Sequence, residues 1–230
     1  MANIGRDGTY YFDFRVLFHM NIIKRPLPQF CYSNRTRPIE GLVIHYISCI
    51  YADMPDTWKE KHWNDIEQVW RLLHDMNCEP EQRKYGIYQG PRLYGSYDWL
   101  ISGMGEIWES VPYGYRSWHA GESQWKGRTG CNDFMAGIAL ISAPQHVDDR
   151  INTLGHDEIS MERRKYGFTD AHYMALEHLC RREMKRNDFG LDMITGHDKV
   201  APDRKRDPGH TFDYTRLFSR LKPAYDLNGG

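Results

Sequence analysis

The sequence predicts an α/β fold in which helices flank a mixed central β-sheet. Short apolar runs of strand length, such as 41–48 and 136–141, alternate with stretches whose apolar residues recur at helical spacing, such as 57–75 and 169–187. The chain has 230 residues, of which 40% are hydrophobic, and this suffices for one core with one elaboration. We therefore expect a single domain that carries a helical insertion.

The strands of the expected sheet are marked by β-branched and aromatic residues. Residues 41–48 form a buried run with His45 inside it, and residues 136–141 form a second buried run. Residues 97–102 and 106–111 predict two further strands, because the Gly-Met-Gly segment between them suits a tight turn.

Residues 49–95 differ from their flanks, being charged and rich in tryptophan, and we expect them to form an insertion beside the core. Within this segment a helix is predicted over 57–75, where Thr57 begins a Thr-x-x-Glu capping box. The insertion joins two strands that carry candidate site residues, so it should pack beside the ligand cleft. We expect its loop near Tyr85 and Tyr88 to face the ligand.

The second half of the chain contains the other predicted helices. One covers about 169–187 with Thr169 as its N-cap, and a short one lies around 211–221. With the strands, these elements predict one domain over 1–225, followed by a flexible tail at 226–230. No internal repeat interrupts this organisation.

The composition argues against nucleic-acid and membrane partners. Lysine and arginine number 30 against 31 acidic residues, so the net charge of −1 gives no basic field for nucleic acid. No run approaches the roughly 18 apolar residues of a membrane span, and the N-terminus lacks the apolar core of a secretory signal. Five scattered cysteines without a C-x-x-C pair suit a reducing compartment. We expect a cytoplasmic monomer.

Candidate metal ligands are concentrated near the C-terminus. Gly196 permits a tight bend before His197, and Pro208 holds Asp207 out of the α region, which fixes the direction of its carboxylate. By residue type alone, Asp-Pro-Gly is an ordinary turn, and His45 in an apolar strand is more often a hydrogen-bonded core histidine than a ligand. These residue types alone therefore do not decide whether the chain has a metal site.

Three ordered blocks of sequence change this interpretation. His197 begins the pattern H-x-x-x-A-P-x-R-K-x-D-P-G, an upstream apolar strand carries His45, and residues 118–134 contain W-H-A-G-x-S, G-R and N-D-F. Together they resemble the amidase-2 family, most closely its cytoplasmic amidases that recycle anhydro-muropeptides. The resemblance implies hydrolysis of the amide between N-acetylmuramic acid, or its 1,6-anhydro form, and the L-alanine of peptidoglycan stem peptides.

The same resemblance places Zn²⁺ on His45, His197 and Asp207. Two imidazoles and one carboxylate leave the fourth tetrahedral position open, which is the catalytic pattern of zinc. Zinc lowers the pKa of a bound water to about 7 and polarises a carbonyl. Lys205 would share a face with Asp207 in an extended segment and stabilise the oxyanion, although a lysine in a basic run is otherwise a solvated charge.

Four further residues are expected to contact the muropeptide. An indole can stack on a sugar face, and guanidinium and amide groups can bind carboxylates and acetamido groups. These residues are Trp118, His119, Arg128 and Asn132. The alternative for Trp118 is a core position, and the alternative for Arg128 is a surface charge.

One position departs from the family. The recycling amidases have a glutamate general base where this chain has Ala139. Residues 96–101 are similar to a strand of animal peptidoglycan-recognition proteins and of a phage lysozyme, which lack the glutamate and use a tyrosine at the position of Tyr97. Tyr97 would then orient the attacking water. The competing explanation is that Ala139 is an engineered change that inactivates the enzyme.

Two other functions share the fold. A non-hydrolysing peptidoglycan-binding protein would typically lack the three metal ligands, and all three are present here. A phage or antibacterial lytic amidase, released at lysis, would share the chemistry and differ in its delivery. The sequence favours the recycling amidase.

Overall fold

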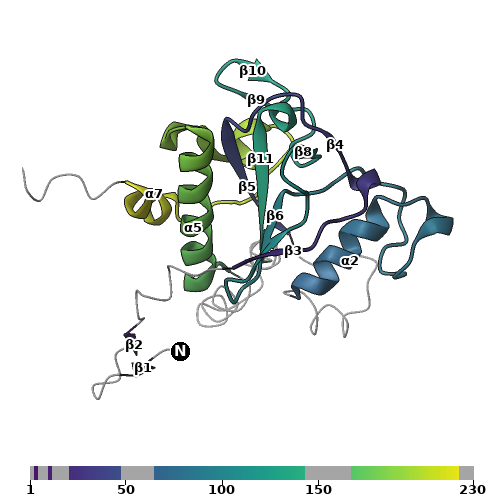
Figure 1. The fold of residues 1–230 in the computed structure, drawn as a ribbon, viewed down its shortest axis with the longest axis horizontal. Helices are drawn as coiled ribbons and strands as arrows, with labels where there is room; N and C mark the ends of the chain where they lie inside the picture. Colours follow the sequence, from purple (N-terminus) through teal and green to yellow (C-terminus); the bar gives the residue numbers. More distant parts are fainter. Residues whose placement is uncertain (1–2, 5–9, 12–20, 48–64, 143–166, 223–230) are drawn as a thin grey trace, which may run out of the picture.

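The computed structural model describes residues 3–4, 10–11, 21–47, 65–142 and 167–222. Six strands of this part form one mixed sheet, as Figure 1 shows. In spatial order they are β12 (Ile194–Gly196), β5 (Gly41–Ile47), β11 (Met135–Ile141), β6 (Trp99–Ile101), β7 (Ile107–Glu109) and β3 (Ile22–Lys24). Strands β12, β5, β11 and β6 run parallel, β7 is antiparallel to β6, and β3 is parallel to β7. The predicted fold class is confirmed.

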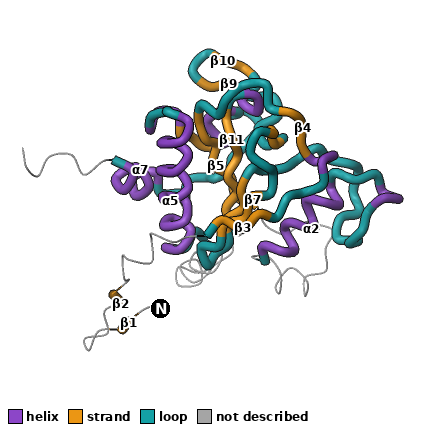
Figure 2. The backbone as a smooth tube through the Cα atoms, in the orientation of Figure 1, coloured by secondary structure: helices purple, strands orange, loops and turns teal. Residues whose placement is uncertain are grey.

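Helices cover both faces of this sheet (Figures 1 and 2). One face packs against α5 (Asp170–Asn187) and α7 (Tyr214–Leu221), and the core there joins Ile44 and Ile138 to Leu176 and Leu217. The other face packs against α2 (Ile66–Met76). Because alternate strand residues point to opposite faces, His45 lies on the α2 side of β5. No helix among the described residues is long and apolar enough to cross a membrane.

Shorter elements complete the description. The two-stranded ribbons are β1 (Asn3–Ile4) with β2 (Tyr10–Tyr11), β4 (Tyr32–Asn34) with β8 (Tyr115–Ser117), and β9 (Gln124–Trp125) with β10 (Arg128–Thr129). The short helices are the 3₁₀ turns η2 (Gln29–Cys31), η3 (Pro80–Gln82), η4 (Cys131–Asp133) and η5 (Leu191–Met193), and α6 (His197–Val200).

Most predicted elements are confirmed, with one clear error at the start of α2. The predicted core strands and the hairpin turn at 103–105 are present, and Thr169 caps α5 by accepting a 3.1 Å bond from the His172 amide. The helix predicted over 57–75 instead begins at residue 66. Asp65 is the N-cap there, because its carboxylate accepts the backbone amides of residues 67 and 68 at 2.9 and 3.3 Å.

Some expectations lie outside the described residues. Thr57 and the first half of the predicted helix belong to the segment 48–64, and the expected tail at 226–230 lies beyond residue 222. The short helix expected around 211–221 is α7, and it begins three residues later because the Asp213 carboxylate caps the Arg216 amide at 2.8 Å.

Candidate metal centre and active-site cavity

Three side chains from separate segments converge at the carboxyl end of the parallel strands. His45 lies within β5, and His197 follows β12 directly as the first residue of α6. Because Gly196 pairs with Ile44 across the two parallel strands, His197 reaches the site beside His45. The loop after α6 returns to it, since the Asp198 amide donates to the Asp207 carbonyl at 2.7 Å.

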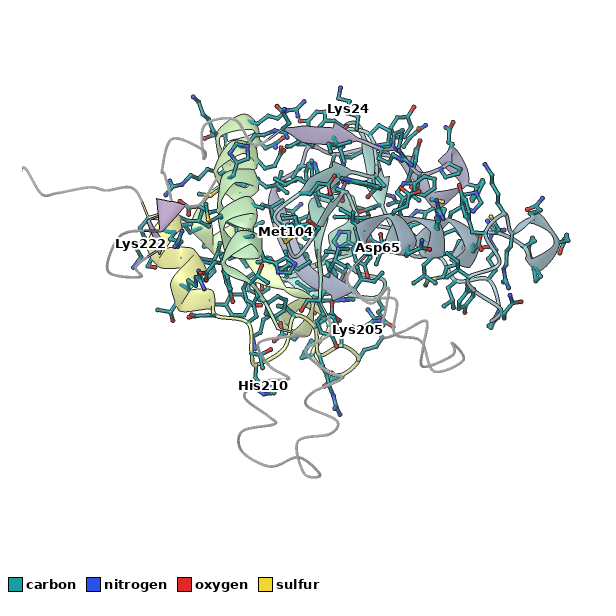
Figure 3. All side chains as sticks on the ribbon, turned by 90° about the horizontal axis from the view of Figure 1, so that it is seen from below. Lys24, Asp65, Met104, Lys205, His210 and Lys222 are labelled. Atoms are coloured by element: carbon teal, nitrogen blue, oxygen red, sulfur yellow. The ribbon has the colours of Figure 1, made fainter. Side chains whose placement is uncertain are left out.

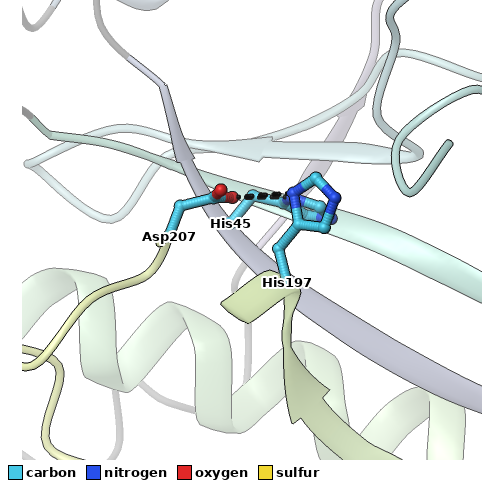
Figure 4. A group of neighbouring side chains, drawn as sticks. All are labelled: His45, His197 and Asp207. Carbon is cyan, nitrogen blue, oxygen red and sulfur yellow. Dashed lines mark hydrogen bonds and ion pairs between the residues drawn. The ribbon is translucent and has the colours of Figure 1, made fainter. Parts of the chain in front are cut away.

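The geometry of these three side chains suits one small cation. Asp207 Oδ2 lies 2.9 Å from His45 Nδ1 and 3.2 Å from His197 Nδ1. Figure 4 shows the three side chains pointing toward one another. All three ligand atoms lie within 4.8 Å of one another, and no other such cluster occurs among the described residues. In tetrahedral zinc, bonds of 2.0–2.1 Å separate neighbouring ligand atoms by roughly 3.3 Å. The nitrogen and oxygen donors therefore fit a zinc ion with little movement.

The electrostatics keep His45 and Asp207 in their metal-binding protonation states. Burial lowers the pKa of His45 to about 4, and the hydrogen bond and charge of Asp207 only partly oppose this. For Asp207, burial raises the pKa, but hydrogen bonds from His197 and His45 outweigh it and hold the pKa below its ordinary value. At neutral pH the site thus offers a neutral imidazole and a carboxylate, as metal binding requires.

A cavity of about 680 Å³ opens beside the ligands. His197 and Asp207 form part of its lining, to which Arg204, Lys205 and Arg206 add positive charge. Figure 3 shows Lys205 on the same side of the molecule as His210. Another part of the lining comes from the expected insertion, through residues 93–95 and the α2 residues Leu73 and Met76. The described part of the segment 49–95 therefore borders the cavity.

The aromatic residues of that segment differ from expectation. Tyr85 packs edge-on against His74 at 5.0 Å between ring centroids, and Tyr88 is buried in the cluster around α2. Neither tyrosine lines the cavity, so the loop reaches it further along the chain than expected, at residues 93–95. Tyr94 lines the cavity instead, with 64% of its surface exposed and its ring 5.5 Å from that of Trp118. Tyr94 lies in no recognisable motif, so sequence alone gave no sign of it.

Tyr97 and Ala139 occupy contrasting places near His45. The Tyr97 ring is half-buried, lines the cavity, and has its centroid 5.0 Å from that of His45. Ala139 pairs with His45 across β11 and β5, and it is fully buried in a cluster with Leu100 against which Tyr97 packs. The strand position next to His45 thus carries a methyl group in an apolar setting, with a phenol close by.

Of the four expected substrate contacts, two line the cavity and two are engaged in contacts within the protein. Trp118 lines the cavity, whereas Arg128 lies on β10 and forms an ion pair with Glu40 at 2.5 Å. His119 has its imidazole 3.0 Å from that of His45, and the Asn132 side chain accepts backbone amides of the neighbouring loop. The structure brings Trp118 and His119 to the cavity, and it engages Arg128 and Asn132 in contacts within the protein.

The fold and the site together define a class of protein. Two histidines and an aspartate converge at the end of a mixed sheet, beside a cavity that His197 and Asp207 help to line, and this arrangement suits a metal-dependent hydrolase. Residues 35–210 match the family described as N-acetylmuramoyl-L-alanine amidase. The chain belongs to this family of amide-bond hydrolases.

The relatives agree with this assignment. The chain is 37% identical to the 1,6-anhydro-N-acetylmuramyl-L-alanine amidase AmpD of Enterobacter cloacae, over 80% of this chain and 82% of that protein. It is 33% identical to the AmpD of Haemophilus influenzae, over 86% and 87% of the two chains. A crystal structure of a selenomethionine AmpD derivative superposes with a TM-score of 0.61 at 29% identity, covering 89% of this chain and 97% of that one.

Proposed function

We propose that this chain is a zinc-dependent amidase that cleaves the amide between 1,6-anhydro-N-acetylmuramic acid and the L-alanine of a stem peptide. The observation that carries the proposal is the convergence of His45, His197 and Asp207 at a cavity large enough for a substrate. The names of the AmpD relatives supply the bond and the anhydro sugar. Zinc bound there would acidify a water molecule and polarise the amide carbonyl.

Side chains that line the cavity are suited to the other steps of hydrolysis and to binding the sugar. Tyr97, beside His45, is suited to orient the attacking water, because a phenol can both donate and accept a hydrogen bond. Lys205, in the cavity lining, is suited to stabilise negative charge on the carbonyl oxygen. Tyr94 and Trp118 present aromatic faces on which a sugar ring can pack.

The biological setting is part of the proposal. Peptidoglycan fragments that carry a stem peptide are the expected partners, with no nucleic acid or membrane, and we expect a monomer in the cytoplasm. The four cysteines of the described residues are free and buried, which supports a reducing compartment. No observation favours release at lysis over recycling.

Digestion of a defined muropeptide tests the function directly. The zinc-loaded chain is incubated with anhydro-N-acetylmuramyl tripeptide, and the products are identified by mass spectrometry. We expect the free tripeptide and the anhydro sugar, whose summed mass exceeds that of the substrate by one water. An intact substrate that nevertheless binds would instead identify a non-hydrolysing peptidoglycan-binding protein.

Lys205→Ala is expected to lower kcat by about 10²-fold with little change in KM, because an oxyanion contact strengthens mainly in the transition state. Steady-state kinetics on the muropeptide measure this. Lys199→Ala is the matched control, since Lys199 is 60% exposed on α6 and pairs with Asp198. A Lys205 variant that raises KM and leaves kcat unchanged would indicate ground-state binding of an anionic stem.

A further inference from the structure

One short segment contacts the outer nitrogens of both ligand histidines. His45 Nε2 lies 3.0 Å from His119 Nδ1, and His197 Nε2 lies 3.3 Å from the carbonyl oxygen of Ala120. His119 and Ala120 are consecutive and almost wholly buried. Two neighbouring residues of a loop thus contact the Nε2 atoms of the two histidines, whereas Asp207 lies beside their Nδ1 atoms.

These contacts permit one consistent set of hydrogen bonds. If His45 and His197 bind the metal through Nδ1, each must carry its proton on Nε2 and donate from there. The Ala120 carbonyl can only accept, as required. His119 Nδ1 must then accept from His45, so its own proton is on Nε2, which lies 3.2 Å from the Met135 carbonyl oxygen. Each ring nitrogen in this chain of contacts has one defined role.

The surrounding structure holds His119 in this place. A β-carbon at residue 137 of β11 would lie 2.6 Å from His119 Cγ, so Gly137 leaves the space that the imidazole occupies. Asn132 Oδ1 accepts the backbone amides of His119 and Ala120 at 3.1 and 2.7 Å. Arg204 donates to the Ala120 carbonyl at 2.5 Å and fixes it from the other side. The imidazole and the carbonyl are therefore both immobilised.

We propose that His119 is a positioning residue of the metal centre and not a contact to the substrate. It fixes the tautomer and ring orientation of His45, while the Ala120 carbonyl does the same for His197 and Asn132 anchors both. The inference rests on the metal site of the proposed function but is independent of the bond that is cleaved. Its consequence is that changes at His119 act first on zinc affinity.

The zinc affinity of the 230-residue chain, measured by competition with a chromogenic chelator, tests the inference. His119→Phe keeps a ring but removes the acceptor, and we expect zinc to bind about 10- to 100-fold more weakly. In His119→Asn, Oδ1 stands near the position of Nδ1, so affinity should stay within about threefold of wild type. His172→Phe is the matched control, because His172 is equally buried but lies in α5, and its zinc affinity should be unchanged.

Two results would overturn the inference. One is wild-type zinc affinity in His119→Phe, and the other is an equal loss in His119→Asn and His119→Phe. Should His119→Phe not fold, long-range ¹H–¹⁵N spectra of the zinc-loaded wild-type chain decide instead. They should show His119 protonated on Nε2, whereas a proton on Nδ1 would contradict the proposed acceptor. If any of these results is obtained and the unaltered chain still binds zinc and hydrolyses the muropeptide, only the role of His119 is refuted and the proposed function is not.

Discussion

His197→Ala should leave the chain without stoichiometric zinc and lower amide hydrolysis by about 10³-fold or more. The metal supplies several kcal/mol of transition-state stabilisation, and two remaining ligands hold zinc weakly. His197 Nδ1 lies 3.2 Å from Asp207 Oδ2, and its loss would also leave that partly buried carboxylate with one fewer donor. Elemental analysis and muropeptide kinetics on the same sample measure both effects.

His210→Ala is the matched control for this experiment. His210 is exposed in the same C-terminal loop, on the same side of the molecule as Lys205 (Figure 3), and belongs to no ligand cluster. Its removal should change neither the zinc content nor kcat. A His197→Ala chain that retains one zinc with wild-type affinity would refute the assignment of the ligands.

Tyr97→Phe should lower kcat by about 10²-fold, the usual scale of one acid–base group, while the chain keeps its zinc. The phenol is the candidate because it borders the cavity beside His45, and Ala139 offers no carboxylate at the strand position next to that histidine. Tyr113→Phe is the matched control, since the Tyr113 hydroxyl bonds to Asn187 outside the cavity lining. Unchanged kcat in Tyr97→Phe would contradict the role of the phenol.

Ala139→Glu separates the two explanations for the missing glutamate. Ala139 is fully buried, so a glutamate there must place a charge among apolar side chains or displace Tyr97. If Tyr97 is the native group, the substitution should lower the free energy of unfolding and should not raise turnover. If Ala139 is an inactivating change, the unaltered chain should be nearly inert, and Ala139→Glu should raise turnover about 10²-fold.

The sequence was most informative where chemistry and local structure coincide. β5 and β11 are short apolar runs, which predict buried strands. In the ligand motif around His197, Gly196 permits a tight bend and Pro208 restricts the backbone of Asp207. The start of α2 could not be predicted in the same way. Thr57 and Asp65 both offer capping side chains, so the sequence alone does not decide where α2 begins.

Side-chain direction was the main quantity that sequence did not predict. Arg128 and Asn132 lie in the right motif, but Arg128 turns to Glu40, which is 88 residues distant in sequence. His119 likewise reaches His45 because of the register of β11, where Gly137 leaves room for it. Motif spacing brings residues to a region, whereas their partners depend on how separate segments pack.

Zinc titration of the metal-free chain tests the central claim most directly. The chain is stripped with a chelator, zinc is returned in steps, and hydrolysis of anhydro-N-acetylmuramyl tripeptide is followed by mass spectrometry of the released peptide. We predict no hydrolysis without metal, a linear rise with added zinc, and a plateau at about one ion per chain, as one three-ligand site requires. Full hydrolysis by the metal-free chain, or none by a chain carrying one zinc, would contradict the account.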